Sequence, residues 1–230
     1  SYYGNITFID HQIGRVLYEL RRHDAEAWAN TLVIFTSDHG DMMGDHHHWR
    51  KTYAYEGSAR VPFLMRFPSN WDIDRDQVLD QPIELRDIMP TILDAAGVDI
   101  PESVDGDSLL KLAKGSTEWR DFVQGEHTTC YDHDYGMQYL TDGREKYIWY
   151  HHTGEEMLFD LDDDPLECHE RSKDSAYADR VAIWRKRLAD LNEQRGDPRG
   201  RNGELVVQKE ALRLSPHYNQ LKQRAAEQMV

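Results

Sequence analysis

The chain has 230 residues, a net charge of −15 and 39% hydrophobic residues, which allow one large or two small domains with a hydrophobic core. The acidic balance argues against a general nucleic-acid binder, and no apolar run approaches the length of a membrane span. The chain runs into a helical pattern directly after Ser1. We therefore expect a piece of a longer protein, and its localisation, cytoplasmic or extracytoplasmic, stays open.

Apolar residues recur at helical spacing from Ile6 to Leu20, with charged residues mostly between them. This pattern predicts an amphipathic helix of about four turns that covers one face of a sheet. An unbroken apolar run, Leu32 to Phe35, comes next and predicts a strand buried on both faces of a mostly parallel sheet. A helix followed by a strand at this distance is half of an α/β unit.

Asp38 and His39 follow the apolar strand directly, and Gly40 comes next. In open α/β sheets, ligands bind beyond the carboxyl ends of the strands. A carboxylate oxygen beside an imidazole nitrogen suits a divalent cation, and Gly40 lets the backbone turn away from it. The polar start of an ordinary loop would look the same, so the pair alone leaves both interpretations open.

A long polar loop, Gly40 to Gly57, follows the pair, and a loop of this size inside a domain is usually functional. Lys51 lies towards its end, where an ammonium group can return to the strand and bind a sulfuryl or phosphoryl oxygen, or protonate a leaving oxygen. His46, beside His47 and His48, is a candidate for proton transfer or substrate contact. A surface lysine and a solvated histidine loop remain the plain alternatives.

The rest of the first half predicts one more strand and one more helix. Val61 to Phe67 is an apolar strand with Pro62 at its start or on its edge. Pro82 to Gly97 holds a short helix, with Asp87 as its N-cap and Pro90 in its first turn.

Short alternating segments begin after Lys114 to Trp119. They predict a small antiparallel sheet with a hairpin turn at Asp142-Gly143. Leu166 to Gln194 predicts a helix with one apolar stripe. The tail from Gly196 predicts an extended segment with one late helix. The predicted strands are Asp121–Glu126, Gly136–Thr141, Lys146–Tyr150 and Met157–Leu161, and the stripe is Val181, Trp184, Leu188 and Leu191.

Two cysteines, Cys130 and Cys168, are too few for a disulfide framework. We expect free thiols that serve packing, because neither lies in an electropositive setting at a strand end. Asp162 to Asp164 is expected to form a turn set by Pro165, because the alternating ligands and the glycine of an EF-hand calcium loop are missing.

Trp49, Tyr53 and Tyr55 fit either a stack against a sugar face or the hydrophobic core. For Arg50 and Arg60 we expect ordinary surface pairs rather than contacts to an anion.

Several motifs, in order from Tyr3 to about Leu161, resemble sulfatases of the alkaline-phosphatase-like superfamily. The resemblance implies an α/β fold: residues 1–116 would be the C-terminal half of a catalytic domain with a mixed sheet flanked by helices. Residues 117–230 would be a small α+β subdomain with an antiparallel sheet. The motifs are Tyr3-Gly4 leading to Ile9-Asp10 and Ile13-Gly14, NTLVIFTSDHGD, Gly44 to His46 with Trp49 and Lys51, YEGSARVPFLMRFP, DIMPTILDAAGVDIP, VDGDSLL and LFDLDDDPLE.

The resemblance also implies roles for matching residues. Asp38 and His39 resemble the family's metal-binding pair, which holds calcium most often and otherwise magnesium or manganese. Lys51 resembles the lysine that contacts the sulfate, and His46 resembles a residue near the substrate. Scaffold positions are implied at Asp10, Gly14, Pro62, Thr91 and Gly106.

One departure from the family pattern concerns the catalytic nucleophile. The C/S-x-P-x-R motif that yields the formylglycine nucleophile is absent, so it is expected upstream. The implied full-length enzyme attacks a sulfate ester, on a small molecule or a glycan, and releases the alcohol and then sulfate. The alternatives are a phosphonate monoester or phosphodiester hydrolase of the same superfamily, and a catalytically inactive fragment.

Overall fold

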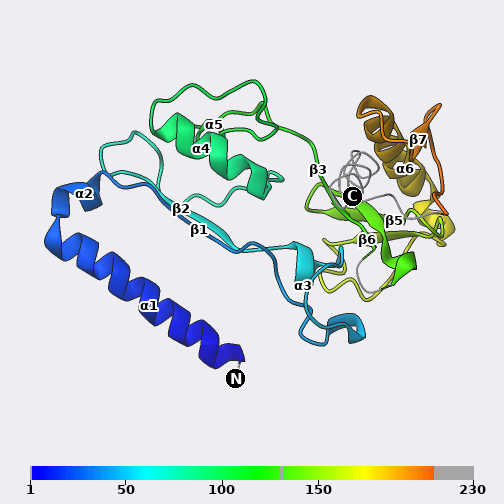
Figure 1. Cartoon of the computed structure of the whole chain (residues 1–230), viewed down its shortest axis with the longest axis horizontal. Helices are drawn as coiled ribbons and strands as arrows, with labels where there is room; N and C mark the ends of the chain where they lie inside the picture. Colours follow the sequence, from blue (N-terminus) through cyan, green and yellow to red (C-terminus); the bar gives the residue numbers. More distant parts are fainter. Residues whose placement is uncertain (1, 130–131, 210–230) are drawn as a thin grey trace, which may run out of the picture. The chain divides into compact units, whose positions relative to one another are not determined.

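The computed structural model describes residues 2–129 and 132–209, and these residues form two units. Figure 1 labels the α-helices and most of the strands. The predicted assignment of residues 1–116 to a catalytic domain and of residues 117–230 to a C-terminal subdomain stays a prediction. Among the described residues, the first unit takes 2–38, 61–79 and 84–119, and the second takes 39–60, 80–83, 120–129 and 132–209.

The first unit begins with the predicted helix, α1 (Tyr2–His23), followed by the short α2 (Ala25–Ala29). Basic residues fill the last turn of α1, where the helix dipole favours positive charge. No residue of α1 is buried, and its main neighbour is α2. Among the described residues, α1 therefore does not pack a buried face on the sheet, contrary to the prediction.

Strands β1 (Val33–Thr36) and β2 (Phe63–Arg66) confirm the two predicted apolar strands, but they pair antiparallel, with Val33 opposite Arg66. The parallel pairing expected for β1 is wrong within the described residues, and so is its full burial, since Phe35 is 40% exposed. The physical reason is the connection. The two ends of the connecting loop meet, with the N–H of Gly40 donating to the carbonyl of Ser58, so the chain enters β2 beside the end of β1 and Thr36 lies opposite Phe63. Strands joined in this way run antiparallel, whereas a parallel pair needs a crossover to the other end of the sheet.

Helix α4 (Ile88–Ala95) confirms the predicted short helix, with Pro90 in its first turn. Asp87 occupies the N-cap position, but its side chain makes no cap bond to α4. It is fully buried and instead accepts the backbone N–H groups of Glu84 and Asp107, each at 2.9 Å. This carboxylate therefore joins two loops of the first unit. The neighbouring short elements are η2 (Leu85–Asp87) and α5 (Leu110–Ala113).

The second unit contains the predicted antiparallel sheet, whose four strands are hydrogen-bonded to one another in chain order. Figure 1 shows this sheet beside α6. The hairpin at Asp142-Gly143 is confirmed: Gly143 has φ +89°, and Asp142 accepts the N–H groups of Arg144 and Glu145 at 2.9 and 2.8 Å. A left-handed conformation at this position suits glycine. The strands are β3 (Val123–His127), β4 (Met137–Thr141), β5 (Glu145–Tyr150) and β6 (Glu156–Asp160).

Helix α6 (Ala178–Gln194) packs its predicted apolar stripe into the same core as the sheet. Trp184 is 1% exposed, and its indole N–H donates to Glu145 at 2.9 Å, so its polar atom is satisfied. Strands β7 (Gly200–Arg201) and β8 (Glu204–Leu205) form a hairpin on α6. The late helix predicted for the tail lies outside the described residues.

Cys168 is a free thiol but is exposed, so the predicted packing role is wrong for it; it lies in the turn region that follows Pro165. Cys130 lies outside the described residues. The turn predicted at Asp162 to Asp164 is confirmed, with the N–H of Asp164 donating to the carbonyl of Asp160 at 2.8 Å. Among the described helices, none combines the length and the hydropathy needed to cross a bilayer.

Candidate functional site

Asp38 and His39 come directly after β1, and both are exposed. Ser37 Oγ lies 3.5 Å from an Asp38 carboxylate oxygen. His39 Nδ1 lies 2.7 Å from the carbonyl oxygen of Gly40, which can only accept a hydrogen bond. In the neutral ring, Nδ1 therefore carries the hydrogen and Nε2 presents its lone pair. A carboxylate oxygen and an imidazole lone pair are both donors that a divalent cation accepts.

The pair fits part of a coordination sphere. A protein-bound divalent cation takes about four or more ligands. Across residues 2–129 and 132–209, no three His, Cys, Asp or Glu side chains gather closely enough to hold one. Asp38 and His39 therefore fit as two ligands of a larger set.

The residues that follow form the site loop, defined here as residues 39–60. Its two ends cross closely: the N–H of Gly40 donates to the carbonyl of Ser58 at 2.9 Å. A Cβ at Gly40 would lie 2.2 Å from the carbonyl oxygen of Gly57, so only glycine fits at this crossing. Residues 41–56 thus form a loop whose two ends are held together by this backbone contact.

The backbone inside the site loop is strained. Asp41 Oδ1 accepts the N–H groups of Met43 and Arg50 at 3.0 and 3.1 Å and holds the two sides of the loop together. Non-glycine residues with positive φ are uncommon, and they cluster at ligand sites when the surroundings hold them in place. Those in this loop are Met43, His46, His47, Arg50 and Thr52.

His46, in the short helix η1 (Asp45–His47), is held on two sides. Its ring stacks on Tyr55 with centroids 4.1 Å apart and planes 7° apart, and Nε2 lies 3.1 Å from the carbonyl oxygen of Leu166. The Nε2 hydrogen is therefore committed to that carbonyl. In the neutral ring, Nδ1 keeps a lone pair for other contacts.

The neighbouring aromatic residues separate into core and surface. Tyr55 is 8% exposed in a hydrophobic cluster, and Tyr53 packs against the same cluster, which answers the open question for these two in favour of packing. Trp49 is 65% exposed. Burial lowers the pKa of His48, which stacks on Tyr53 at 4.2 Å, and the neighbouring histidines lower it further.

Lys51 is exposed and lies on the site loop with His39 and His46. Three of the four predicted residues thus lie on one loop, as their positions in the sequence require, and Asp38 precedes it in the chain. The return of the Lys51 amine to the Asp38-His39 pair stays a prediction. Arg60 pairs with Glu56 at 3.3 Å on the surface, as expected.

Sequence reasoning missed Lys146, whose buried amine pairs with Glu56 at the start of the short helix α3 (Glu56–Ala59). A signal was present, since Lys146 is the one charged residue in the run Lys146 to Tyr150. A charged residue is almost never fully buried unless it is paired.

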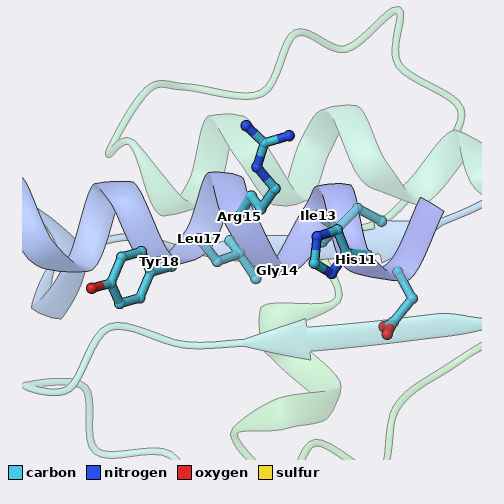
Figure 2. Close-up of a pocket in the computed structure, with 7 residues that line it drawn as sticks. His11, Ile13, Gly14, Arg15, Leu17 and Tyr18 are labelled. Carbon is cyan, nitrogen blue, oxygen red and sulfur yellow. The ribbon is translucent and has the colours of Figure 1, made fainter. Parts of the chain in front are cut away.

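The first unit also carries a hollow of about 420 Å³, lined by α1 alone (Figure 2). Arg15 and Tyr18 project from the helix in different directions there. Ligand sites bring a few polar groups together in a concave, enclosed place, and one face of one helix does not do this. None of the predicted site residues lines the hollow.

Comparisons with known proteins identify the family. A family model described as "N-sulphoglucosamine sulphohydrolase, C-terminal" matches residues 44–194. An arylsulfatase of Clostridium perfringens is 45% identical over 190 residues, which cover 82% of this chain and 38% of that protein. The chain belongs to the sulfatase family. This sulfatase chain spans about two fifths of the length of the curated relative.

Solved structures confirm the predicted α/β, alkaline-phosphatase-like fold. A putative sulfatase, yidJ, from Bacteroides fragilis has a TM-score of 0.74 at 28% identity, over 86% of this chain and 42% of that one. A phosphonate monoester hydrolase of Agrobacterium radiobacter has a TM-score of 0.67 at 29% identity, over 84% and 40%. A protein solved with its substrate D-glucosamine-2-N,6-O-disulfate has a TM-score of 0.71 at 24% identity, over 84% and 40%, and shows the fold alone.

Proposed function

We propose that the protein containing this chain is a sulfuric ester hydrolase, which converts a sulfate ester to an alcohol and sulfate. Membership of the sulfatase family supports the reaction class. The observation that carries the proposal is the exposed Asp38-His39 pair at the end of β1, followed on the site loop by Lys51.

Asp38 and His39 are proposed to hold a divalent cation, calcium first and magnesium or manganese as alternatives. The Nδ1 contact to the Gly40 carbonyl supports this, because it favours the neutral tautomer with its lone pair on Nε2. When bound, such a cation supplies positive charge to the sulfuryl oxygens. The formylglycine nucleophile is proposed to come from a segment upstream of Ser1, because the 230 residues contain no C/S-x-P-x-R motif.

Lys51 is proposed to bind a sulfuryl oxygen, since its ammonium group is exposed on the site loop. Charge that develops on the transferring group is stabilised by such a fixed cation. His46 is proposed to lie near the substrate, where only Nδ1 is open for contact, because Nε2 faces the Leu166 carbonyl.

The substrate is proposed to be a sulfated glycan or a small sulfate ester. Trp49 supports either, because its exposed ring lies two residues before Lys51 and can stack on a sugar or aryl face. The fold is shared with a protein solved with a disulfated glucosamine, which is consistent with the glycan.

The test uses the full-length protein and nitrophenyl sulfate. Lys51→Ala is expected to lower kcat/KM by about 10²–10³, the usual loss when one charge-stabilising donor is removed. Lys114→Ala, another exposed lysine, is the control and is expected to keep the wild-type value. Equal values for both variants would exclude Lys51 from the sulfate site.

The metal is tested by calorimetric titration with Ca²⁺. Asp38→Asn is expected to weaken binding at least tenfold, while Asp105→Asn, at another exposed aspartate, leaves it unchanged. Unchanged binding in Asp38→Asn would remove this pair from the metal site.

A phosphonate monoester hydrolase is the second candidate, favoured by the similarity to the enzyme of Agrobacterium radiobacter. Parallel assays with a nitrophenyl phosphonate monoester separate the two, and much faster phosphonate turnover would reverse the ranking. The isolated 230-residue chain is proposed to be inactive, because it holds two candidate ligands and no formylglycine motif. Measurable turnover by it would contradict this.

A further inference from the structure

The site loop packs against the sheet of the second unit. Met42 and Ala54 are at most 1% exposed, and they share a hydrophobic cluster with Met137, Ile148 and Phe159 of the sheet. Apolar contact of this kind holds the loop against the sheet but does not fix its register, because it is non-directional.

An ion triad around a buried amine fixes the position of the loop, because its bonds are directional. Lys146, on β5, is fully buried, and its Nζ lies 2.6 Å from Glu56 Oε1 and 2.9 Å from Glu167 Oε1. The backbone N–H of Glu56 also donates to Glu167 Oε2 at 2.7 Å. Glu56 opens α3, so these three bonds fix the second half of the site loop. The Lys146 triad is defined as Lys146, Glu56 and Glu167.

The same turn of chain holds the first half of the loop. Leu166, next to Glu167, accepts from His46 Nε2 at 3.1 Å, and the His46 ring stacks on Tyr55 beside Glu56. Lys51 thus lies between two anchor points, at His46 and Glu56, that are ten residues apart in the numbering.

A triad of this kind is poorly explained by stability alone. Burying charges costs solvation, and replacing a buried ion cluster by apolar residues of similar size is often neutral or stabilising. Burial raises the pKa of Glu167, against the opposing effect of the Lys146 ammonium. The bonds of the triad are directional, so they can hold the loop in one conformation. That conformation includes uncommon backbone angles, at His46, Arg50 and Thr52 among others.

We infer that the Lys146 triad is a positioning device that holds the site loop, and with it Lys51, in the conformation that binds the sulfuryl group. This inference rests on the proposed role of Lys51. The triad residues act through the loop: Lys146 and Glu167 are 0% and 3% exposed and have no access to a substrate.

The first experiment measures kinetics of the full-length enzyme well below its thermal midpoint. Lys146→Met is expected to lower kcat/KM by about 10–100-fold, since a misplacement of about 1 Å at a reacting group can cost about 10²-fold. In a Lys51→Ala background the same change is expected to have less than about a twofold effect, because its target is gone. Lys186→Met, which removes an exposed lysine paired with Asp190 on α6, is the matched control and keeps wild-type kinetics. Independent losses that multiply in the double variant would overturn the inference.

The second variant separates positioning from folding. The triple change Lys146→Met, Glu56→Leu and Glu167→Leu removes all three charges together and leaves no buried charge unpaired. Its thermal midpoint is therefore expected to lie within a few degrees of wild type. The loss in kcat/KM is expected to remain. If activity recovers together with the midpoint, the triad is merely structural, and this arm decides the question even if Lys146→Met alone fails to fold.

Hydrogen exchange gives a readout without turnover. Amides of residues 41–52 are expected to exchange at least tenfold faster in the folded triple variant than in wild type, while those of β4 and β5 stay unchanged. Unchanged exchange in the loop would overturn the inference. An enzyme inactive on both esters with this exchange pattern would refute the proposed function and leave the positioning of the loop supported.

Discussion

The two units differ in how they are held together. Both hydrophobic clusters found in the described residues lie in the second unit, where the sheet, α6 and part of the site loop share them. In the first unit, α1 has no buried residue, and the fully buried carboxylate of Asp87 joins two loops. The candidate site loop thus takes its support from the unit that has its own core.

The largest expected effect tests that core. Trp184→Ala in this chain is expected to lower the free energy of unfolding by about 3–5 kcal/mol, because it removes a large buried ring and leaves a cavity. Urea unfolding followed by circular dichroism measures it. Ile183→Ala, at the neighbouring residue with 53% exposure, is the control and should change stability by less than about 0.5 kcal/mol. A loss below about 1 kcal/mol at Trp184 would break the comparison.

The next effect tests the polar anchor of the first unit. Asp87→Ala is expected to cost about 2–3 kcal/mol, because two backbone N–H groups lose a charged acceptor in a buried place. Asp105→Ala, at an exposed aspartate, is the matched control and should be nearly neutral. Thermal unfolding of both variants gives the measurement. Equal midpoints would show that the first unit depends on something other than this carboxylate.

A pH dependence follows from the buried His151 of the second unit. Its pKa is lowered to about 4, mainly by burial and also by the nearby Arg199 and His152, while Asp197 and Glu126 oppose the shift. The ordinary value in the unfolded chain is about 6.5, so protonation favours unfolding. Its contribution to stability is complete above about pH 6.5 and is lost as the pH falls towards 4.

The measurement compares slopes of unfolding free energy against pH between 6.5 and 4. His151→Gln is expected to flatten the slope, because the side chain no longer titrates. His11→Gln, at an exposed histidine of α1, should leave the slope unchanged. Parallel slopes for wild type and His151→Gln would show that other groups carry the acid sensitivity.

The smallest expected effect is on α1. Phe8 is 64% exposed, so Phe8→Ala in this chain should change the unfolding free energy by less than about 0.5 kcal/mol. Urea unfolding measures it beside the Trp184 variant. A loss above about 1 kcal/mol would mean that α1 is packed after all, and the contrast between the units would weaken.

The second unit was predictable because its signals are local. Alternation along the strands and the stripe on α6 report which face meets a core, and the structure places the strands within a few residues of the prediction. Helix α6 ends at Gln194 as predicted but begins only at Ala178, well after Leu166. The apolar run of β1 was read correctly as a strand. Its partner direction was not, because a continuous apolar run carries no information about parallel or antiparallel pairing.

For the candidate site, the sequence located Asp38-His39 at the end of β1, because an apolar run that stops at charged residues marks that end. The contact of His46 with Leu166 was not predictable, because it joins residues 120 positions apart, beyond any local pattern. The buried amine of Lys146 was visible only as a charge in an apolar strand, and its partners come from two other segments. Long-range polar contacts of this kind need the fold before they can be named.

The glycine crossing of the site loop has a consequence for how such a protein can diversify. The two ends of the loop meet at Gly40 and Gly57, so their separation is independent of what lies between them. Closing a longer loop costs little additional free energy, about 0.6 kcal/mol for each doubling of its length, because the entropy loss grows slowly with length. Exchanges at exposed residues between the anchored ones, such as Trp49, are therefore tolerable while the crossing, His46 and the Lys146 triad are kept. Selection for a new alcohol group can act at those exposed residues.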